Sequence, residues 1–146
     1  MCELLQLTIS DEETLRQAED HLHDGFIDPS TVVFDPGISA FSLVMWRVIG
    51  SHQLLRIFNV PDNWARCRFT VRQVGRAEVI VEDKGLWPVF IAFTYRPGSG
   101  TLEFELAMAM KIRVHIRSLD GELTDIGDTS RNPTKWTKSP ATGAEP

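Results

Sequence analysis

Apolar residues occupy every second position over one long stretch, and this pattern constrains the fold more than any other sequence feature. Eight apolar side chains fall at the even positions from Leu102 to Ile116, while small, polar or charged residues fill the odd positions from Thr101 to Arg117. Alternate side chains of an extended strand point to opposite faces, whereas a helix would break this phase. Because a typical strand has about 3–10 residues, we expect the stretch to bend or divide near residues 107–109.

A glycine-containing loop before this stretch fixes the pairing of two strands. If Pro97-Gly98-Ser99-Gly100 closes a hairpin, Arg96 lies opposite Thr101. Counting back gives three pairs on the apolar face: Tyr95 with Leu102, Phe93 with Phe104 and Ile91 with Leu106. A shift of one residue would mix apolar and polar faces, so the loop and the alternation predict the same register.

One short amphipathic helix is predicted near the N-terminus, over residues 11–22. Ser10 and Glu13 have the spacing of a capping box, and the apolar residues that follow recur at helical spacing: Leu15, Ala18 and Leu22. We expect Gly25 to end the segment in the left-handed conformation.

Further strands follow the helix. Phe26 to Phe34 is predicted to be an edge strand or an extended segment closed by Asp35-Pro36-Gly37, because Pro29 cannot donate to a strand ladder. Phe41 to Trp46 is apolar at both parities, which indicates a strand covered on both faces. Cys67, Phe69 and Val71 alternate with arginine and threonine, so that strand is half-buried and the Cys67 thiol lies on the apolar side, where it is unreactive. Residues 50–64 are predicted to form a loop.

The predicted fold class is α+β, mostly β: a curled antiparallel sheet or partial barrel of about seven or eight strands with one N-terminal helix. A two-layer α+β sandwich is the alternative arrangement. Asp120-Gly121 predicts a two-residue hairpin turn. Polar residues dominate from Gly127 onwards, with Trp136 as the single large apolar side chain. We therefore expect one globular domain over residues 1–126 and a flexible tail over residues 127–146.

Composition limits the classes of partner and chemistry. The net charge of −5 argues against a dedicated nucleic-acid binder. Two cysteines are too few for a disulfide framework or a four-cysteine zinc module. Because neither an export signal nor a membrane-length apolar run occurs, the sequence predicts a cytoplasmic protein with no membrane partner. Catalytic signature motifs are missing, so no catalytic residue and no cofactor are predicted.

The most unusual short motif is His21-Leu22-His23-Asp24-Gly25. Two histidines beside a carboxylate suit a zinc ion, but residues two apart on a helix point about 200° apart. The favoured interpretation is a helix C-terminus, where histidines suit the negative end of the dipole. No metal ligand is predicted, and His21, His23 and Asp24 remain candidate binding residues.

Charge and aromatic residues suggest other surfaces. Residues 1–35 carry nine acidic side chains and one basic one, an imbalance that would steer a basic protein partner. The basic residues of later strands form either a basic face or, as we favour, ion pairs across the sheet with four glutamates: Glu78, Glu82, Glu103 and Glu105. Trp64 and Trp87 stand beside loops and predict an exposed aromatic patch. His115 is the last candidate binding residue.

The step Leu22-His23-Asp24-Gly25, with the strand-like segments Phe26-Ile27-Asp28, Val32–Asp35 and Leu43-Val44-Met45, resembles a group of small bacterial proteins. In that group a His-Asp-small step after a short helix introduces a β-rich domain, and some members are immunity proteins of polymorphic toxin systems. The resemblance covers about residues 20–48, and Gly25 departs from the usual alanine. It implies a non-enzymatic binding module in which His23 and Asp24 are structural.

We therefore expect a non-catalytic module that binds a protein partner or a second copy of itself. The alternative is a small-molecule binder or enzyme with a pocket in the mouth of the sheet, near His23, Asp24, His115 or Trp87. A sheet interior filled by side chains such as Phe69 and Phe93 would argue against that alternative.

Overall fold

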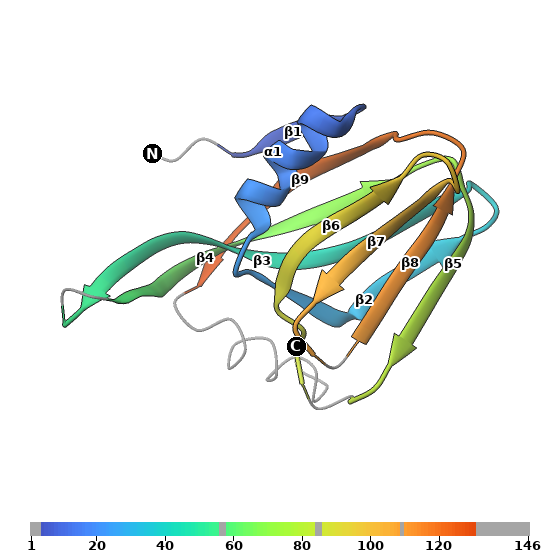
Figure 1. Cartoon of the computed structure of the whole chain (residues 1–146). Coiled ribbons are helices and arrows are strands. Elements are labelled where there is room, and N and C mark those ends of the chain that lie inside the picture. The colour runs from blue at the N-terminus through green and yellow to red at the C-terminus, as the bar shows by residue number, and fades with distance from the viewer. Residues whose placement is uncertain (1–3, 56–57, 84–85, 109, 131–146) are drawn as a thin grey trace.

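The computed structural model describes residues 4–55, 58–83, 86–108 and 110–130, shown in Figure 1. These residues form nine strands and one helix. The first half contains β1 (Gln6–Ile9), α1 (Glu12–Leu22), β2 (Phe26–Asp35), β3 (Ala40–Leu54) and β4 (Phe58–Val71). The second half contains β5 (Val74–Val81), β6 (Phe90–Arg96), β7 (Thr101–Leu106), β8 (Met110–Ile116) and β9 (Gly121–Ser130).

The strands form two antiparallel sheets with a shared core between them. The five-stranded sheet has the order β1-β9-β4-β3-β2, and the four-stranded sheet has the order β5-β8-β7-β6. A bridge between Phe26 and Val89 links the start of β2 to the segment before β6, so the sheets approach along one side without closing into a barrel. The predicted class, α+β and mostly β with an N-terminal helix, is confirmed. Within the described residues there is no helix long and apolar enough to cross a membrane.

The helix forms where it was predicted but is capped one residue later. The Asp11 carboxylate accepts from the Thr14 backbone N–H at 2.8 Å, and the Thr14 hydroxyl accepts from the Asp11 N–H at 3.1 Å. This pair satisfies the same free amides that the predicted Ser10–Glu13 box would have satisfied, so that box is wrong. The predicted apolar face is buried, and α1 packs against β1, β3 and β6.

The end of α1 also differs from the prediction. Asp24, not Gly25, takes the left-handed conformation, with φ of 69°. Gly25 is buried at the start of β2, where an added Cβ would lie 2.4 Å from the Trp46 carbonyl oxygen. The glycine is therefore required for the close approach of two backbones, and a side chain at this position would push β2 away from β3.

β3 and β4 form a long hairpin that projects beyond the rest of the molecule in Figure 1. The loop predicted over residues 50–64 is wrong, because the two strands stay paired up to Leu54 opposite Phe58. The register shifts on either side of Gly50 instead. The glycine, asparagine and proline residues that suggested a loop accompany irregular strand pairing here.

The hairpin of β6 and β7 confirms the predicted register over five pairs, from Arg96 opposite Thr101 to Ala92 opposite Glu105. A shift beyond Ala92 then places Phe90 opposite Leu106, so the predicted pairing of Ile91 is wrong and its side chain is exposed. The long alternating stretch divides into β7 and β8, as predicted, and these strands pair with each other. Met108 lies in the connection between them and is exposed, whereas Met110 is in the core.

The last strand corrects two predictions. Asp120-Gly121 is not a hairpin turn, because β8 and β9 belong to different sheets and Gly121 already pairs with Val71 inside the five-stranded sheet. β9 continues to Ser130, so residues 127–130 belong to the sheet rather than to the predicted tail. The remainder of that tail, with Trp136, lies outside the described residues. β1 was not predicted and pairs with β9.

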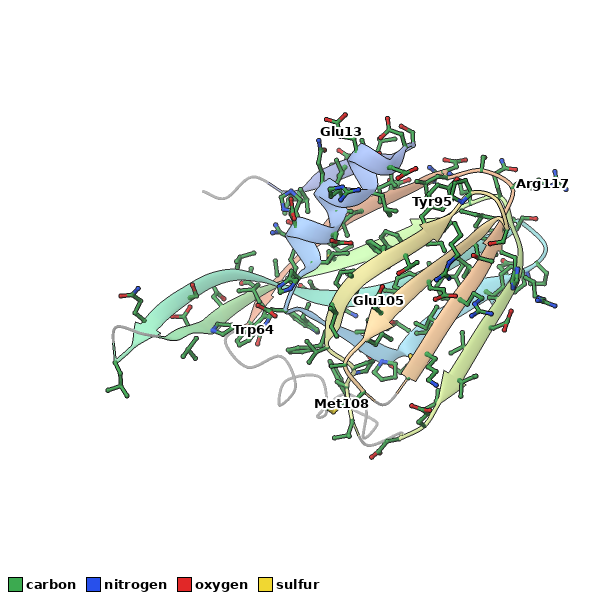
Figure 2. All side chains as sticks on the ribbon, viewed as in Figure 1. Glu13, Trp64, Tyr95, Glu105, Met108 and Arg117 are labelled. Carbon is green, nitrogen blue, oxygen red and sulfur yellow. The ribbon has the colours of Figure 1, made fainter. Side chains whose placement is uncertain are left out.

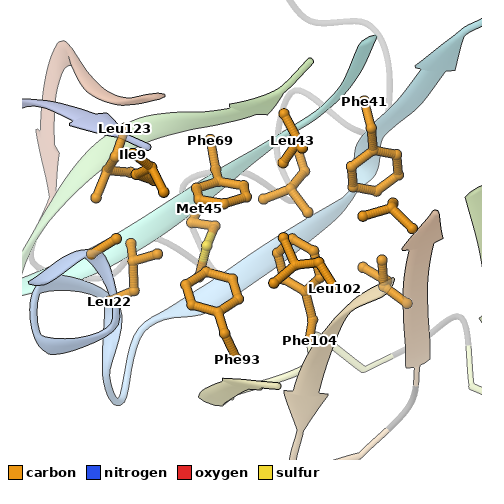
Figure 3. Close-up of a cluster of buried hydrophobic side chains, with 14 of the residues drawn as sticks. Ile9, Leu22, Phe41, Leu43, Met45, Phe69, Phe93, Leu102, Phe104 and Leu123 are labelled. Carbon is orange, nitrogen blue, oxygen red and sulfur yellow. The ribbon is translucent and has the colours of Figure 1, made fainter. Parts of the chain in front are cut away.

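Aromatic rings fill the space between the two sheets, as Figure 3 shows. Phe69 of the five-stranded sheet stacks on Phe93 of the four-stranded sheet with 5.2 Å between ring centroids. Phe104 meets both rings edge-on, at 5.1 Å from Phe93 and 5.4 Å from Phe69. Such pairs contribute about 0.5–1.5 kcal/mol each beyond the burial of their area. The interior between these strands is therefore close-packed.

The close approach at Gly25 gives a first prediction. Replacing Gly25 with alanine should lower the free energy of unfolding by about 3 kcal/mol, because the new methyl group overlaps a backbone oxygen that cannot rotate away. Urea denaturation measures this change. Gly98→Ala is the matched control: an added Cβ meets nothing within 4 Å there, so the change should stay within about 0.5 kcal/mol. Equal effects of the two variants would contradict the prediction.

Candidate binding surface

Two of the predicted binding residues, Trp64 and Trp87, are linked through Phe26 of the five-stranded sheet. Both rings contact Phe26, with centroid distances of 6.0 Å for Trp64 and 5.8 Å for Trp87. Phe26 begins β2, Trp64 lies on β4 at the base of the projecting hairpin (Figure 2), and Trp87 precedes β6. All three side chains are partly exposed. We call Phe26, Trp64 and Trp87 the aromatic cluster.

Strand alternation explains why the cluster faces outwards. Cys67 and Phe69 of β4 point into the core, so Trp64 and Arg66 point away from it. On β3, Trp46 lies opposite both Phe26 and Arg66 on this same outer side, and it is 0% exposed. The prediction that the strand is covered on both faces over Phe41–Trp46 is therefore confirmed. Nearby, the indole N–H of Trp64 and the Nε–H of Arg66 are buried without an acceptor in the described part of the chain.

An acidic helix surface precedes this cluster along the chain, because α1 ends four residues before Phe26. The exposed carboxylates on and beside α1 are those of Asp11, Glu12, Glu13, Asp20 and Asp24, against the exposed cation of Arg16. Figure 2 shows Glu13 directed away from the sheets. We call these five carboxylates the acidic helix face. Negative charge near the start of α1 also suits the positive end of the helix dipole.

The structure separates the residues of the His-x-His motif. His23 Nδ1 lies 3.3 Å from Asp24 Oδ1, and both side chains are exposed at the helix end. The charge of His21 acts instead on Asp125 of β9. No group of three metal-ligating side chains occurs among the described residues. His23 and Asp24 thus form a local pair beside the helix end.

His115 lies on the outer side of the four-stranded sheet. Its Nε2 is 2.5 Å from Glu78 Oε2 and 3.0 Å from Arg76 Nη2. The hydrogen bond with His115, followed by the charge of Arg76, lowers the pKa of the Glu78 carboxyl. His115 is therefore engaged within its own sheet, through side chains of β5.

The predicted ion pairing of the basic side chains is confirmed on the four-stranded sheet. Arg113 Nε lies 2.8 Å from Glu103 Oε2, and Lys111 Nζ lies 3.8 Å from Glu82 Oε2. Arg66 of β4 pairs instead with Asp128 of β9, and Arg72, the residue after β4, pairs with Asp120 and Glu122 at the start of β9. The cations that might have formed one basic face belong to two different sheets.

Sequence reasoning missed a buried ion pair between Arg47 and Asp125. Arg47 Nε and Nη2 donate to the two carboxylate oxygens at 2.9 and 2.8 Å, and the Leu5 N–H donates to Oδ2 at 2.9 Å. The side chains are 13% and 5% exposed. The sequence did contain a signal. Arg47 is two residues from the inward-facing Met45 on the same strand, so its guanidinium group also points inwards and needs a buried partner. Its partner, 78 residues away, was not visible in the sequence.

This ion pair affects the pKa of Asp125 itself and the pKa of the nearby Cys67 thiol. Burial would raise the pKa of the Asp125 carboxyl, but the hydrogen bonds from Arg47 and Leu5 outweigh burial and hold the pKa below its ordinary value. Burial, followed by the charge of Asp125, raises the pKa of the Cys67 thiol to about 12. The ion pair also lines a hollow of about 500 Å³ whose other walls include Leu4, Val48 and Ile49.

Comparisons with protein-family models, with curated proteins and with solved structures find no match to this chain. The resemblance to immunity proteins therefore stays a prediction.

The buried ion pair predicts a pH-dependent stability difference. Asp125→Asn should lower the free energy of unfolding by about 3 kcal/mol at pH 7, because Arg47 is left without its countercharge. The folded-state pKa of Asp125 is depressed, so its contribution is present above the unfolded pKa of about 4 and is lost as the pH falls through the folded pKa. Urea unfolding of wild type and variant should therefore converge below about pH 4.

Asp128→Asn is the control for that experiment. Asp128 pairs with Arg66 at the surface, where an ion pair contributes about 1 kcal/mol or less. A difference between wild type and Asp125→Asn that stays constant down to pH 3 would show that the carboxylate charge is not the cause.

The raised pKa of Cys67 predicts an inert thiol. In the folded protein at pH 8, iodoacetamide should leave Cys67 unmodified, because burial suppresses the reactive thiolate and blocks access. Peptide mapping by mass spectrometry reads out this residue separately from Cys2. Unfolding in urea should make Cys67 react, and rapid labelling of Cys67 without denaturant would refute its inward placement.

Proposed function

We propose that this protein is a non-catalytic module that binds a protein partner through the aromatic cluster and the acidic helix face. One observation carries the proposal: Trp64 and Trp87 come from separate segments and both pack on Phe26 outside the core. Tryptophan is strongly enriched among the residues that dominate binding energy, since it offers a large apolar area with a polar N–H. Three partly exposed rings in contact suit the centre of an interface.

The charge on α1, which ends four residues before Phe26 of the cluster, defines the chemistry of the partner. The acidic helix face presents five carboxylates against one arginine in the described part of α1 and its flanks. A basic protein surface would be attracted to it, which raises the rate of encounter and makes binding weaken with salt. An apolar patch within that basic surface would cover the aromatic cluster. A toxin of this character is one such partner, in accord with the resemblance to immunity proteins.

The packing of the core favours an outer surface over a pocket in the mouth of the sheet. Phe69, Phe93 and Phe104 contact one another where such a pocket would have opened. The hollow at Arg47 supports the alternative, a small-molecule site, since about 500 Å³ suits a small ligand. However, two guanidinium N–H groups of Arg47 already donate to Asp125. The Asp125 carboxylate balances the positive charge of Arg47, so the hollow offers little net charge to an anionic ligand.

Site-specific photocross-linking in native cells tests the proposal. A photoreactive residue replaces exposed Leu86, beside the cluster, or Glu13 on the helix, and a third replaces Arg113 on the outer side of the four-stranded sheet. One protein of basic charge should be captured from the first two positions and not from the third. Capture of nothing, or equal capture from all three positions, would refute the proposed surface.

The captured protein then gives a quantitative prediction. Trp64→Ala and Trp87→Ala should each weaken its binding about 30-fold in calorimetric titration, the effect of losing about 2 kcal/mol at a central interface residue. Tyr95→Ala is the matched control, because Tyr95 is a partly exposed aromatic residue on β6 outside the cluster. Thermal unfolding of each variant checks that the fold is kept. If Tyr95→Ala weakens binding as much as the tryptophan variants, the cluster is not the binding centre.

A further inference from the structure

Three of the four sheet edges in the described part of the chain are protected against pairing with another strand. β1 has four residues, and β2 contains Pro29 and an irregular register between Asp28 and Val33. β6 lies against α1, and the Glu19 carboxylate accepts from the outward Phe93 N–H at 3.0 Å. Short length, proline, irregular pairing and a covering helix are the devices that keep edge strands from associating.

β5 is the edge that lacks these devices from Arg76 onwards. It has eight residues and no proline, and its register with β8 is regular from Arg76 to Val81. Its inward-facing residues, Ala77, Val79 and Val81, carry no charge. On its outer edge, the Val74 N–H at the start of the strand donates to the Ser39 carbonyl at 2.9 Å, and no other strand of the described chain pairs there.

The exposure of apolar side chains marks the same edge. Val79, Ile80 and Val81 are 38%, 55% and 42% exposed, although Val79 and Val81 lie opposite the core residues Ile112 and Met110. An inward-facing valine stays exposed when no neighbouring strand covers its flank. A strand added beside β5 would bury Val79 and Val81 and satisfy its backbone groups.

The charges of β5 and of Glu82, the residue that follows it, match those of a second copy in reverse. In antiparallel pairing, opposite residues share a face, so a two-fold axis relating two copies must pass at a residue. With the axis at Val79, Arg76 of each copy lies opposite Glu82 of the other, and the two Val79 side chains meet. With the axis at Glu78 two copies of Glu78 face each other, and with the axis at Ile80 Glu78 faces Glu82. Both of these registers oppose like charges, which is unfavourable.

An axis at Ala77 would also bring opposite charges together, Arg76 against Glu78. It would set Ile80 against Val74, whose edge N–H already bonds to Ser39, and would leave Val81 uncovered. It would also use the irregular part of β5 between Val74 and Arg76. The axis at Val79 covers the exposed valines and uses the regular part of the strand.

We infer that β5 is a dimerisation edge, at which two copies of this chain pair antiparallel about Val79 and join their four-stranded sheets into one. Complementary charges at Arg76 and Glu82 select this register, and the contact of Val79 and Val81 with the second copy supplies apolar burial. In Figure 1, β5 lies at the side of the molecule opposite the projecting hairpin. The dimer therefore leaves that hairpin and α1 accessible, and it is independent of the function proposed for the aromatic cluster.

Sedimentation velocity of the full chain over a concentration series tests dimer formation. Wild type should show a reversible monomer–dimer equilibrium. Val79→Lys should weaken the dimer at least about tenfold, because two lysines meet at the axis. Ile80→Lys is the matched control: it replaces a neighbouring exposed apolar residue, but the new lysine faces Glu78 of the second copy, so the dimer should persist. A monomer at every concentration, or equal effects of the two variants, would overturn the inference.

A charge exchange tests the register. Arg76→Glu and Glu82→Arg, each alone, should weaken the dimer at least about tenfold, since each opposes like charges at two symmetric positions. The double variant Arg76→Glu/Glu82→Arg should recover dimerisation, because it restores both opposite-charge pairs with their order reversed. Circular dichroism confirms that each variant is folded. Failure of the double variant to recover, or a dimer indifferent to Glu82→Arg, would overturn the pairing about Val79.

Discussion

The contact between Phe69, Phe93 and Phe104 is the interaction on which the rest of this structure depends. Each sheet has one continuous apolar face, and neither face can be left in water. The three rings belong to both sheets and lie within 5.4 Å of one another, so they hold the apolar faces together and exclude a central cavity. Because side chains alternate along each strand, the remaining residues lie on the faces of the two sheets that point away from the core. The position of Trp64 on the outside is thus a consequence of Phe69 being inside.

Two kinds of feature remain on the surface once the core is closed. The aromatic cluster lies where β2, β4 and the segment before β6 converge, and it offers apolar area beside the carboxylates of α1. The sheet edges form the second kind, and α1 covers one of them through Glu19 while β5 is left open. Both features arise from how the two sheets end. The two proposed associations, with a protein partner and with a second copy of the chain, each use one of these surfaces.

Local sequence signals were most reliable where one strand follows another directly. The register of β6 and β7 followed from the loop between them. A shift of one residue would have moved every apolar side chain of the strand to the opposite face of the sheet. The same kind of signal failed at residues 50–64 and at Asp120-Gly121. Glycine, asparagine and proline occur at turns, at irregular strand registers and at close backbone approaches. Which of these forms depends on the strands that lie beside the segment. Gly25 and Gly121 are both required for close approach to the backbone of a neighbouring strand.

The sequence by itself determined most of the core-facing side chains of the alternating strands, the position of α1 and the pairing of β6 with β7. Those properties depend on periodicity and on short loops, which are local. Only the tertiary structure decided that Trp64 and Trp87 both pack on Phe26 and that Arg47 pairs with Asp125, since these contacts depend on the order of strands in the sheets. Alternation reports the face on which a side chain lies and carries no information about which distant strand lies beside it. The candidate binding residues were therefore partly visible from the sequence, whereas their grouping was not.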